Sequence, residues 1–322
     1  MKTLLVGYKA ADLTPELLEG DVTCHVLDIY HRHAIEKVHH AKVVCSPHLP
    51  EGPWDVVKFK TGPKIHSGEL ALDLLQECYK VAGLRGRDAS APLSGRVEVA
   101  FEGRERDRND LLNKIKDDPK RVRSFKAEWP ASVPGGEKLM FTSYPGCFCH
   151  RRLDEGGLAL AEVVSRDVLN TEAQGHREEG LRLLDMGCGC GLVGFLIANR
   201  ISSLIPHPSS LVLVDSHARA VEAAMANAAK FGIPAEVILS DNGTPARMDG
   251  TFDVFVGNPP YYSDYRIAEV FLETAKRALK PGGICYTVVK NAAGLKPVQE
   301  RYFPQVEVVG RRGYSVLRSV RE

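Results

Sequence analysis

The C-terminal half of the chain alternates short apolar runs with amphipathic stretches, and this alternation constrains the fold more than any other feature. The apolar runs have the length and composition of β-strands, and the stretches between them have helical spacing. The predicted strands are 181–186, 211–214, 237–239, 252–256, 284–289, 306–309 and 314–320, and the predicted helices are 192–199, 218–231 and 267–279. The sequence therefore favours an α/β fold with a doubly wound, mostly parallel sheet. Pro281-Gly282-Gly283 is expected to end the last of these helices.

Acidic residues lie at the carboxyl ends of three of the predicted strands. They are Asp185, Asp215 and Asp241. The carboxyl ends of parallel strands meet at one edge of a sheet, where ligands bind in open α/β folds. Asp215 is placed to accept hydrogen bonds from ribose hydroxyls, and it would serve equally as a cap for the helix that begins at Ala218. Asp241, next to Asn242, either accepts a hydrogen bond from an adenine amino group or closes a turn.

A glycine-rich turn separates the first of these strands from its helix. Gly187, Gly189 and Gly191 occupy alternate positions there. Glycine allows a sharp turn and lets a ligand approach the main-chain N–H groups, and the helix that follows begins with a polar end. Dinucleotide-binding domains share this pattern, so the turn predicts a nucleotide-like ligand without specifying the reaction.

The strongest chemical signal is Gly257-Asn258-Pro259-Pro260-Tyr261, which directly follows an apolar strand. An exocyclic amino group is a poor nucleophile, because its lone pair is delocalised into the ring. The Asn258 side-chain oxygen and the Pro259 carbonyl can each accept one N–H of such an amine, and this favours a pyramidal nitrogen whose lone pair faces a methyl donor. The prolines stiffen the turn, and Tyr261 offers an aromatic face for stacking a base. Asn258, Pro259, Pro260 and Tyr261 are therefore the predicted catalytic residues.

Together these residues resemble the class I S-adenosylmethionine-dependent methyltransferases that carry an Asn-Pro-Pro-Tyr motif. More closely, the chain resembles the ribosomal RNA guanine-N2 methyltransferases, which have two tandem methyltransferase-like domains. The resemblance covers 138–322 well and 1–128 loosely. Residues 144–157 support it, because they are similar to the Pro-Gly-x-Phe-Ser…Leu-Asp-x-Gly stretch of that family. Cys149 replaces the serine of that stretch, and Gly157 replaces the usual serine or threonine.

The resemblance implies a cofactor, a partner and a set of binding residues. It implies S-adenosyl-L-methionine as the cofactor and structured RNA as the partner, either ribosomal RNA or a ribosomal subunit, with guanine-N2 as the target. The implied cofactor-binding residues are Asp185, Gly187, Gly189, Gly191, Asp215, Asp241, Asn242 and Asn258. The family usually has Phe where this chain has Tyr261, and Tyr is commoner in adenine and glutamine methylators. An adenine-N6 or protein-glutamine methyltransferase therefore stays open, as does a non-catalytic RNA-binding scaffold of the same fold.

The N-terminal half repeats the same pattern in a shortened form. Residues 54–57 parallel 252–255, a predicted helix from Glu69 to Gly86 parallels 266–283, and 97–101 parallels 284–289. No glycine-rich turn follows the first strand of this copy, and Thr61-Gly62-Pro63-Lys64 stands where the other copy has its Asn-Pro-Pro-Tyr motif. We expect this copy to have lost its chemistry.

These observations predict three segments. Residues 1–128 form a degenerate methyltransferase-like domain that binds substrate or has a structural role. Residues 129–137 form a linker, since two prolines and two glycines fall within eight residues there. Residues 138–322 form the catalytic domain.

Composition and charge set the remaining expectations. The net charge of +1 argues against a chain that coats RNA non-specifically, although six arginines could contact phosphates around the site or form ordinary surface charge. These arginines are Arg151, Arg152, Arg311, Arg312, Arg318 and Arg321. No apolar run reaches the roughly 18–20 residues of a membrane helix, and the apolar run at the N-terminus is too short for the core of a signal peptide. We therefore expect a cytoplasmic protein without a membrane partner. Eight cysteines without a secretion signal are expected to be reduced, and their Cys-x-Cys spacing predicts no metal site. The oligomeric state is not indicated.

Overall fold

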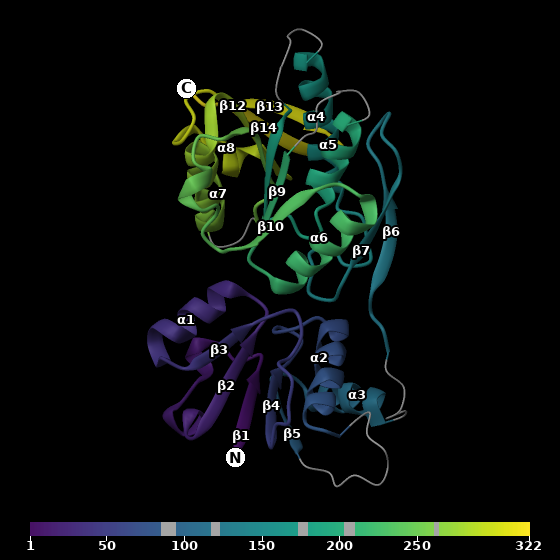
Figure 1. The fold of residues 1–322 in the computed structure, drawn as a ribbon, viewed down its shortest axis with the longest axis vertical. Helices are drawn as coiled ribbons and strands as arrows, with labels where there is room; N and C mark the ends of the chain where they lie inside the picture. The colour runs from purple at the N-terminus through teal and green to yellow at the C-terminus, as the bar shows by residue number, and fades with distance from the viewer. Residues whose placement is uncertain (85–94, 117–122, 173–179, 203–209, 261–263) are drawn as a thin grey trace. The chain divides into compact units, whose positions relative to one another are not determined.

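A computed structural model describes residues 1–84, 95–116, 123–172, 180–202, 210–260 and 264–322. The chain divides into two compact units (Figure 1). The first unit consists of Met1–Lys126, Tyr144–Gly146 and His217–Arg219, and the second consists of Ala127–Ser143, Cys147–Ser216 and Ala220–Glu322. No helix within the described residues is long and apolar enough to cross a membrane.

The first unit is built on a five-stranded parallel sheet in the order β3-β2-β1-β4-β5. Its strands are β1 (Lys2–Val6), β2 (Asp21–Val26), β3 (Lys42–Cys45), β4 (Val56–Thr61) and β5 (Arg96–Phe101), and its helices are α1 (Ile29–His39), α2 (Gly68–Val81) and α3 (Glu105–Lys116). Alternate residues of β1 enter different cores: Leu4 packs in the core that contains α2, and Leu5 packs with Ile35 of α1. The sheet is therefore buried on both faces, as parallel sheets require.

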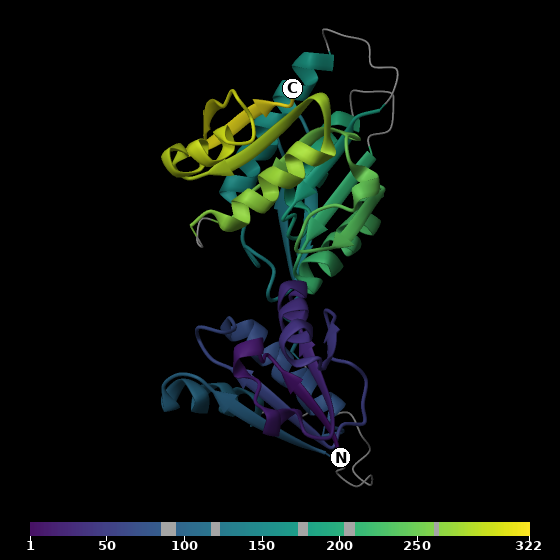
Figure 2. The same cartoon turned by 90° about the vertical axis from the view of Figure 1, so that its left-hand side faces the viewer.

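The second unit is built on a seven-stranded sheet in the order β10-β9-β8-β11-β12-β14-β13. Its strands are β8 (Arg182–Met186), β9 (Ser210–Asp215), β10 (Ala235–Leu239), β11 (Phe252–Gly257), β12 (Leu279–Val289), β13 (Glu307–Arg311) and β14 (Tyr314–Val320). Its helices are α4 (Glu155–Glu172), α5 (Leu192–Ser202), α6 (Ala218–Phe231), α7 (Arg266–Ala278) and α8 (Ala292–Glu300). The first five strands are parallel, while β14 and β13 are antiparallel. Helices α7 and α8 pack side by side in one core (Figure 2).

The same strand order occurs in both units, which confirms the predicted tandem α/β fold. In the first unit β3-β2-β1-β4-β5 is the order, and in the second β10-β9-β8-β11-β12 repeats it. The predicted pairs between the halves correspond to β4 with β11, α2 with α7, and β5 with β12. The second unit extends the pattern with the antiparallel pair β14 and β13.

The predicted linker is wrong over its first part. Ala127–Ala131 forms β6, which pairs antiparallel with β7 (Leu139–Ser143), so the second unit begins at Ala127. Alternate residues of β6 are buried, and Trp129 stacks on Phe141 with ring centroids 5.2 Å apart. The prolines and glycines therefore belong to an edge strand and its turn rather than to an extended connection.

The expected break at Pro281-Gly282-Gly283 is also different in the structure. Helix α7 ends at Ala278, and these residues lie inside β12, which begins at Leu279. The register between β11 and β12 shifts between Phe252 and Val254. The Pro-Gly-Gly segment is thus accommodated as an irregularity at the start of a strand, where such residues are tolerated.

Candidate functional site

The glycine-rich turn joins β8 to α5 and has the left-handed backbone that only glycine adopts readily. The φ angles of Gly187, Gly189 and Gly191 are +68°, +56° and +84°. A Cβ at Gly187 would lie 2.7 Å from Phe271, and one at Gly191 would lie 2.3 Å from Phe195. Both of these glycines are needed for packing. Gly189 differs, because no described atom lies within 4 Å of the position of its Cβ.

Asp215 is the last residue of β9 and is hydrogen-bonded to the glycine-rich turn. Its Oδ2 accepts a hydrogen bond from the backbone N–H of Gly189 at 2.8 Å. In the sheet β9 is the neighbour of β8, so a residue at the carboxyl end of β9 binds the turn that follows β8. The structure therefore brings together two of the predicted cofactor-binding positions.

Asp185 lies within β8 and is almost completely buried. Its Oδ2 accepts a hydrogen bond from the Gly194 N–H at 2.8 Å, at the start of α5. Burial raises the pKa of Asp185 to about 7, and the negative charge of Asp215 acts in the same direction. Among the described residues no lysine or arginine forms an ion pair with this carboxylate. Such a group is suited to a cationic ligand.

Asp241 and Asn242 follow β10 and form a local turn. The Ser240 hydroxyl donates a hydrogen bond to the Asn242 side-chain oxygen at 2.9 Å, and the Ser240 N–H donates to the Asp215 carbonyl at 2.9 Å. The turn is thus held next to the end of β9, where the sequence predicts it. These hydrogen bonds are also the ones expected if the residues only close a turn, which is the other interpretation of Asp241 and Asn242.

Asn258 follows the end of β11 and contacts a residue 104 positions earlier in the chain. Its side-chain Nδ2 donates a hydrogen bond to Oδ2 of Asp154 at 2.8 Å. Because β11 pairs with the opposite edge of β8, Asn258 and the glycine-rich turn leave the carboxyl ends of adjacent strands. Pro259 is buried and Pro260 is half-buried. Tyr261 lies outside the described residues.

Asp154 is the aspartate of the Leu-Asp-x-Gly part of residues 144–157, and the sequence gives it no role of its own. It precedes α4 and caps its first turn, accepting hydrogen bonds from the backbone N–H groups of Gly156 and Gly157 at 3.1 and 2.9 Å. Burial raises its pKa, while the bonds from Gly157, Gly156 and Asn258 oppose that rise. An aspartate just before a helix is a recognisable cap signal, but the contact with Asn258 arises only in the folded chain.

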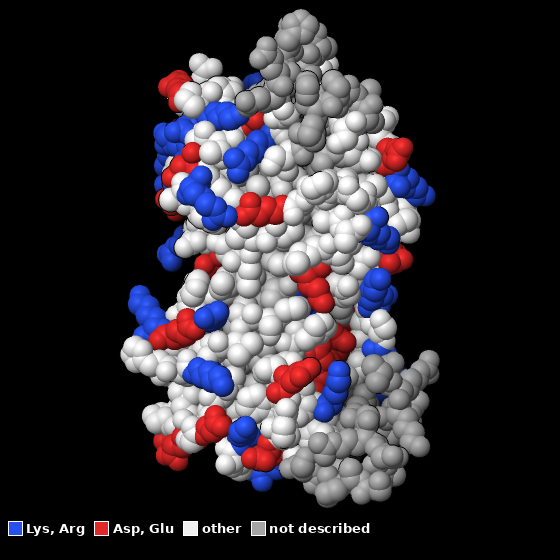
Figure 3. Space-filling view, in the orientation of Figure 1, with Lys and Arg blue, Asp and Glu red and all other residues white. Residues whose placement is uncertain are grey.

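The arginines near the C-terminus bind carboxylates or carbonyls of their own unit. Arg311 and Arg312 both pair with Glu162 of α4, whose side chain is 3% exposed, and Arg312 also pairs with Glu155 at 3.0 Å. Arg321 donates to main-chain carbonyls of Arg277 and Leu279. On the face shown in Figure 3, Lys and Arg side chains are interspersed with Asp and Glu. Of the two interpretations of these arginines, the structure favours a role within the fold for Arg311, Arg312 and Arg321.

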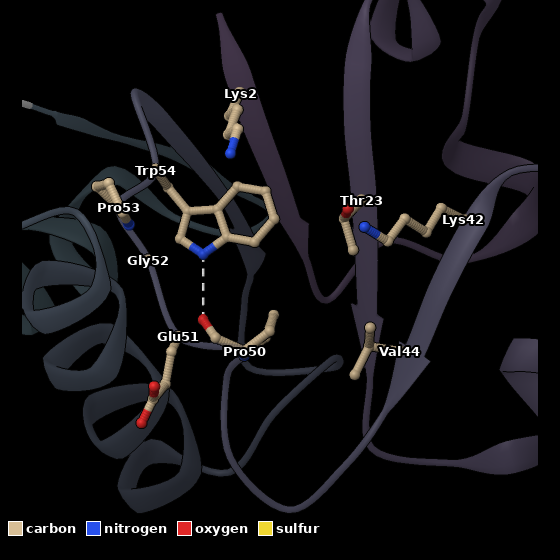
Figure 4. A pocket seen from close by; sticks show the side chains of 9 residues that line it. All are labelled: Lys2, Thr23, Lys42, Val44, Pro50, Glu51, Gly52, Pro53 and Trp54. Atoms are coloured by element: carbon tan, nitrogen blue, oxygen red, sulfur yellow. Dashed lines mark hydrogen bonds between the residues drawn. The ribbon is translucent and has the colours of Figure 1, made fainter.

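A cavity of about 270 Å³ lies within the first unit, beside the amino ends of β1, β2 and β3 (Figure 4). Lys2, Thr23, Lys42 and Trp54 are among its lining residues, and the Trp54 indole donates a hydrogen bond to the Pro50 carbonyl at 3.1 Å. None of the predicted site residues lines this cavity. Within the described ranges, no group of three His, Cys, Asp or Glu residues could hold a metal ion.

The sequence of the chain is similar to those of known methyltransferases. The family model described as "Methyltransferase small domain" matches residues 138–318. The "Ribosomal RNA small subunit methyltransferase C" of Pseudomonas aeruginosa (strain UCBPP-PA14) is 32% identical over 192 residues, which is 56% of this chain and 52% of that protein. The protein of the same name from Haemophilus influenzae (strain PittGG) is 26% identical over 189 residues, 58% of this chain and 52% of that protein. The chain thus spans about half the length of the curated relatives it matches.

A solved structure extends the similarity of the fold to both units. The "16S rRNA N2 G1207 methyltransferase" of T. thermophilus, in complex with AdoMet and guanosine, superposes with a TM-score of 0.77 at 17% identity. The match covers 100% of this chain and 88% of that chain. At this identity the likeness concerns the fold, which in both chains contains two successive α/β units.

Proposed function

The chain belongs to the methyltransferase small domain family, and from that premise we propose that it transfers a methyl group from S-adenosyl-L-methionine to the exocyclic N2 of a guanine in ribosomal RNA. The observation that carries the proposal is the placement of Asn258. Asn258 directly follows the carboxyl end of β11, next to the strand β8 from which the glycine-rich turn continues. Its side-chain amide is hydrogen-bonded to Asp154. The names of the relatives, and the guanosine in the T. thermophilus complex, support the choice of target.

The residues around the turn fit the proposed cofactor. S-adenosylmethionine supplies an electrophilic methyl group on a positively charged sulfur. The buried Asp185 carboxylate, which no described cation neutralises, suits a ligand with positive charge. The open side of Gly189 leaves room for a group to lie against the main chain, and Asp215 at the end of β9 is placed for ribose hydroxyls. Asp241 and Asn242 would then lie toward the adenine.

In the proposed reaction the chain mainly positions the amine. The Asn258 side-chain oxygen accepts one N–H of the target and the Pro259 carbonyl accepts the other, so that the nitrogen lone pair faces the methyl group. Pro260 stiffens the turn, and Tyr261 stacks on the base. A strong general base is not needed, because the methylated, ammonium-like nitrogen is acidic and loses its proton to water. Positioning and exclusion of water supply most of the rate.

The replacement Asn258→Ala tests this assignment. We expect methyl transfer to fall at least about 100-fold, the scale of losing one preorganised hydrogen-bonding group, while the affinity for S-adenosylmethionine falls by a much smaller factor, because the other cofactor-binding residues are intact. Tritiated-methyl transfer measures the first quantity and calorimetry the second. Asn199→Ala is a matched control, since Asn199 is a surface residue of α5 that bonds the Glu137 carbonyl. Full turnover by Asn258→Ala would remove Asn258 from the mechanism.

The proposal also assigns the partner and the roles of the two units. Structured ribosomal RNA, either free or in a ribosomal subunit, is the proposed substrate, and a cytoplasmic location follows from it. The second unit is the proposed catalytic domain, and the first is a degenerate copy that binds substrate or supports the fold. Adenine-N6 or glutamine methylation, suggested by Tyr261, and a non-catalytic scaffold are the competing outcomes. A failure to bind S-adenosylmethionine in calorimetry would favour the scaffold.

A further inference from the structure

The proposed chemistry requires one particular end of the Asn258 amide to face the target amine. An asparagine side chain carries an acceptor oxygen and a donor nitrogen on one planar group, and a rotation of 180° exchanges them. Only the oxygen can accept an N–H from an exocyclic amine. If the nitrogen faced the target instead, two donors would oppose each other. Something in the protein must therefore select the orientation of this amide.

Asp154 supplies that selection. The Asn258 Nδ2 donates to the Asp154 Oδ2 at 2.8 Å, so the amide oxygen points away from Asp154. An ionised carboxylate accepts hydrogen bonds and cannot donate them. A flipped Asn258 would place its oxygen against the carboxylate oxygen, which is repulsive. The carboxylate thus distinguishes the two orientations more sharply than a neutral group such as an amide or hydroxyl could, because these can serve as donor or acceptor.

Asp154 is itself held in one place. The backbone N–H groups of Gly156 and Gly157 donate to its Oδ1 and Oδ2, and the Asp154 carbonyl accepts from the Leu158 N–H in the first turn of α4. A Cβ at Gly157 would lie 2.7 Å from the Asp154 Oδ2, so glycine leaves the space that this carboxylate occupies. The amino end of α4 also favours a negative charge at this point. These contacts hold the carboxylate in one position, and it can therefore orient the Asn258 amide that it binds.

We propose that Asp154 is a positioning residue for methyl transfer, which fixes the side-chain oxygen of Asn258 as the acceptor for the target amine. It acts through Asn258 and does not touch the substrate. The inference rests on the proposed function and adds to it a residue from a segment 104 positions away in the sequence. A charged neighbour on the amide nitrogen also polarises the amide and strengthens the oxygen as an acceptor.

Asp154→Asn is the most informative variant, because it keeps the size of the side chain and a good helix cap. Each orientation of the new amide gives up one backbone bond. With its nitrogen at the Oδ2 position it faces the Gly157 N–H and donates to the Asn258 oxygen, and with its oxygen there it accepts from Asn258 while its nitrogen faces the Gly156 N–H, so the preference for one orientation of Asn258 is weakened. We expect the single-turnover rate of methyl transfer to fall about 10- to 100-fold. The affinities for RNA and S-adenosylmethionine, and the melting temperature, should stay close to those of the unchanged protein. Asp154→Ser, which also keeps a cap but is too short to reach Asn258, should lose a similar factor.

A double-mutant cycle distinguishes positioning from a general structural effect. If Asp154 acts only through Asn258, then Asp154→Asn lowers the rate in the normal background and adds no further loss in the Asn258→Ala background. Losses that multiply in the double variant would overturn the proposal. The side-chain ¹⁵N–¹H₂ signals of Asn258, assigned by their absence in Asn258→Ala, give a readout without turnover. They should shift in Asp154→Asn, and unchanged signals would also count against the proposal.

The same measurements separate this inference from the function on which it rests. If the unchanged protein transfers methyl groups, Asn258→Ala does not, and Asp154→Asn keeps the full rate, then the positioning role is wrong and the proposed function stands. If the unchanged protein transfers no methyl group to RNA, the proposed function fails and the positioning role fails with it. If Asn258→Ala is fully active, Asn258 has no part in the mechanism and the positioning role of Asp154 is wrong, while the proposed function stands.

Discussion

Three aspartates gather around the glycine-rich turn and Asn258, and each is held differently. Asp154 accepts donors from a helix end and from Asn258, and Asp215 accepts the Gly189 N–H. Asp185 is the most deeply buried and accepts one N–H, from Gly194. Because burial of a charge without a cation is costly, Asp185 is the residue whose ionisation should couple most strongly to stability and to ligand binding.

The stability of the second unit should depend on pH through Asp185. Its pKa in the folded chain is about 7, against 3.8 for an ordinary aspartate. Since the folded-state pKa is raised, the neutral form is favoured on folding and no stability is lost below about pH 4. The free energy of unfolding then falls as the pH rises toward about 7, by up to about 4 kcal/mol for a shift of this size.

Asp185→Asn removes this dependence, because the amide oxygen can still accept the Gly194 N–H but carries no charge. In denaturant titrations from pH 4 to 8, the variant should lose less stability than the unchanged protein. Calorimetry should show weaker binding of S-adenosylmethionine to Asp185→Asn. Parallel pH curves for Asp185→Asn and the unchanged protein would contradict the assignment.

Among the helices and strands, ion pairs connect the antiparallel strands β13 and β14 to α4. Arg311 and Arg312 from the end of β13 and the turn before β14 both reach Glu162, which is buried in α4. Removing both cations would leave a buried carboxylate without a partner. Such a group costs about 3–5 kcal/mol, far more than a surface ion pair contributes.

The double replacement of Arg311 and Arg312 by Ala should therefore lower the stability of the second unit, with a melting temperature reduced by several degrees. The slope of RNA affinity against salt concentration should stay unchanged, because these arginines do not serve phosphates. Adding Glu162→Gln should restore part of the lost stability. A flatter salt slope with an unchanged melting temperature would return these arginines to the RNA-binding surface.

The glycine-rich turn offers a test of where S-adenosylmethionine binds, and the same unit contains a matched control glycine. Gly189 and Gly232 have φ angles of +56° and +64°, and no described atom would contact a Cβ at either position. Replacement by Ala should cost each about 1–2 kcal/mol of backbone strain. Only Gly189→Ala should also weaken S-adenosylmethionine binding, because its Cβ would enter the space proposed for the ligand. Equal affinities for the two variants in calorimetry would argue that the ligand does not approach this turn.

The sequence predicts those elements whose pattern is local. The bounds of α6 and β14 agree with the expected 218–231 and 314–320, since apolar spacing and a terminal glycine or turn define them. The hairpin of β6 and β7 is missed, because prolines and glycines outweigh the alternation of buried residues there. The link from Asp154 to Asn258 could not be predicted, since the two residues are 104 positions apart and meet only when α4 and β11 come together.

At the scale of the whole molecule, two units share one strand order but differ in chemistry. Only the second carries the glycine-rich turn and the Asn-Pro-Pro segment among the residues that the structure describes. The net charge of +1 and the mixed charges in Figure 3 fit an enzyme that selects a structured RNA through a pocket rather than through a broad basic field.

The most direct test of this account is tritiated-methyl transfer from S-adenosylmethionine to ribosomal RNA, small ribosomal subunits and protein, followed by analysis of the labelled nucleosides. We expect N2-methylguanosine from ribosomal RNA with the unchanged protein and at least about 100-fold less with Asn258→Ala. Label in N6-methyladenosine or in protein glutamine, or equal labelling by Asn258→Ala, would contradict it.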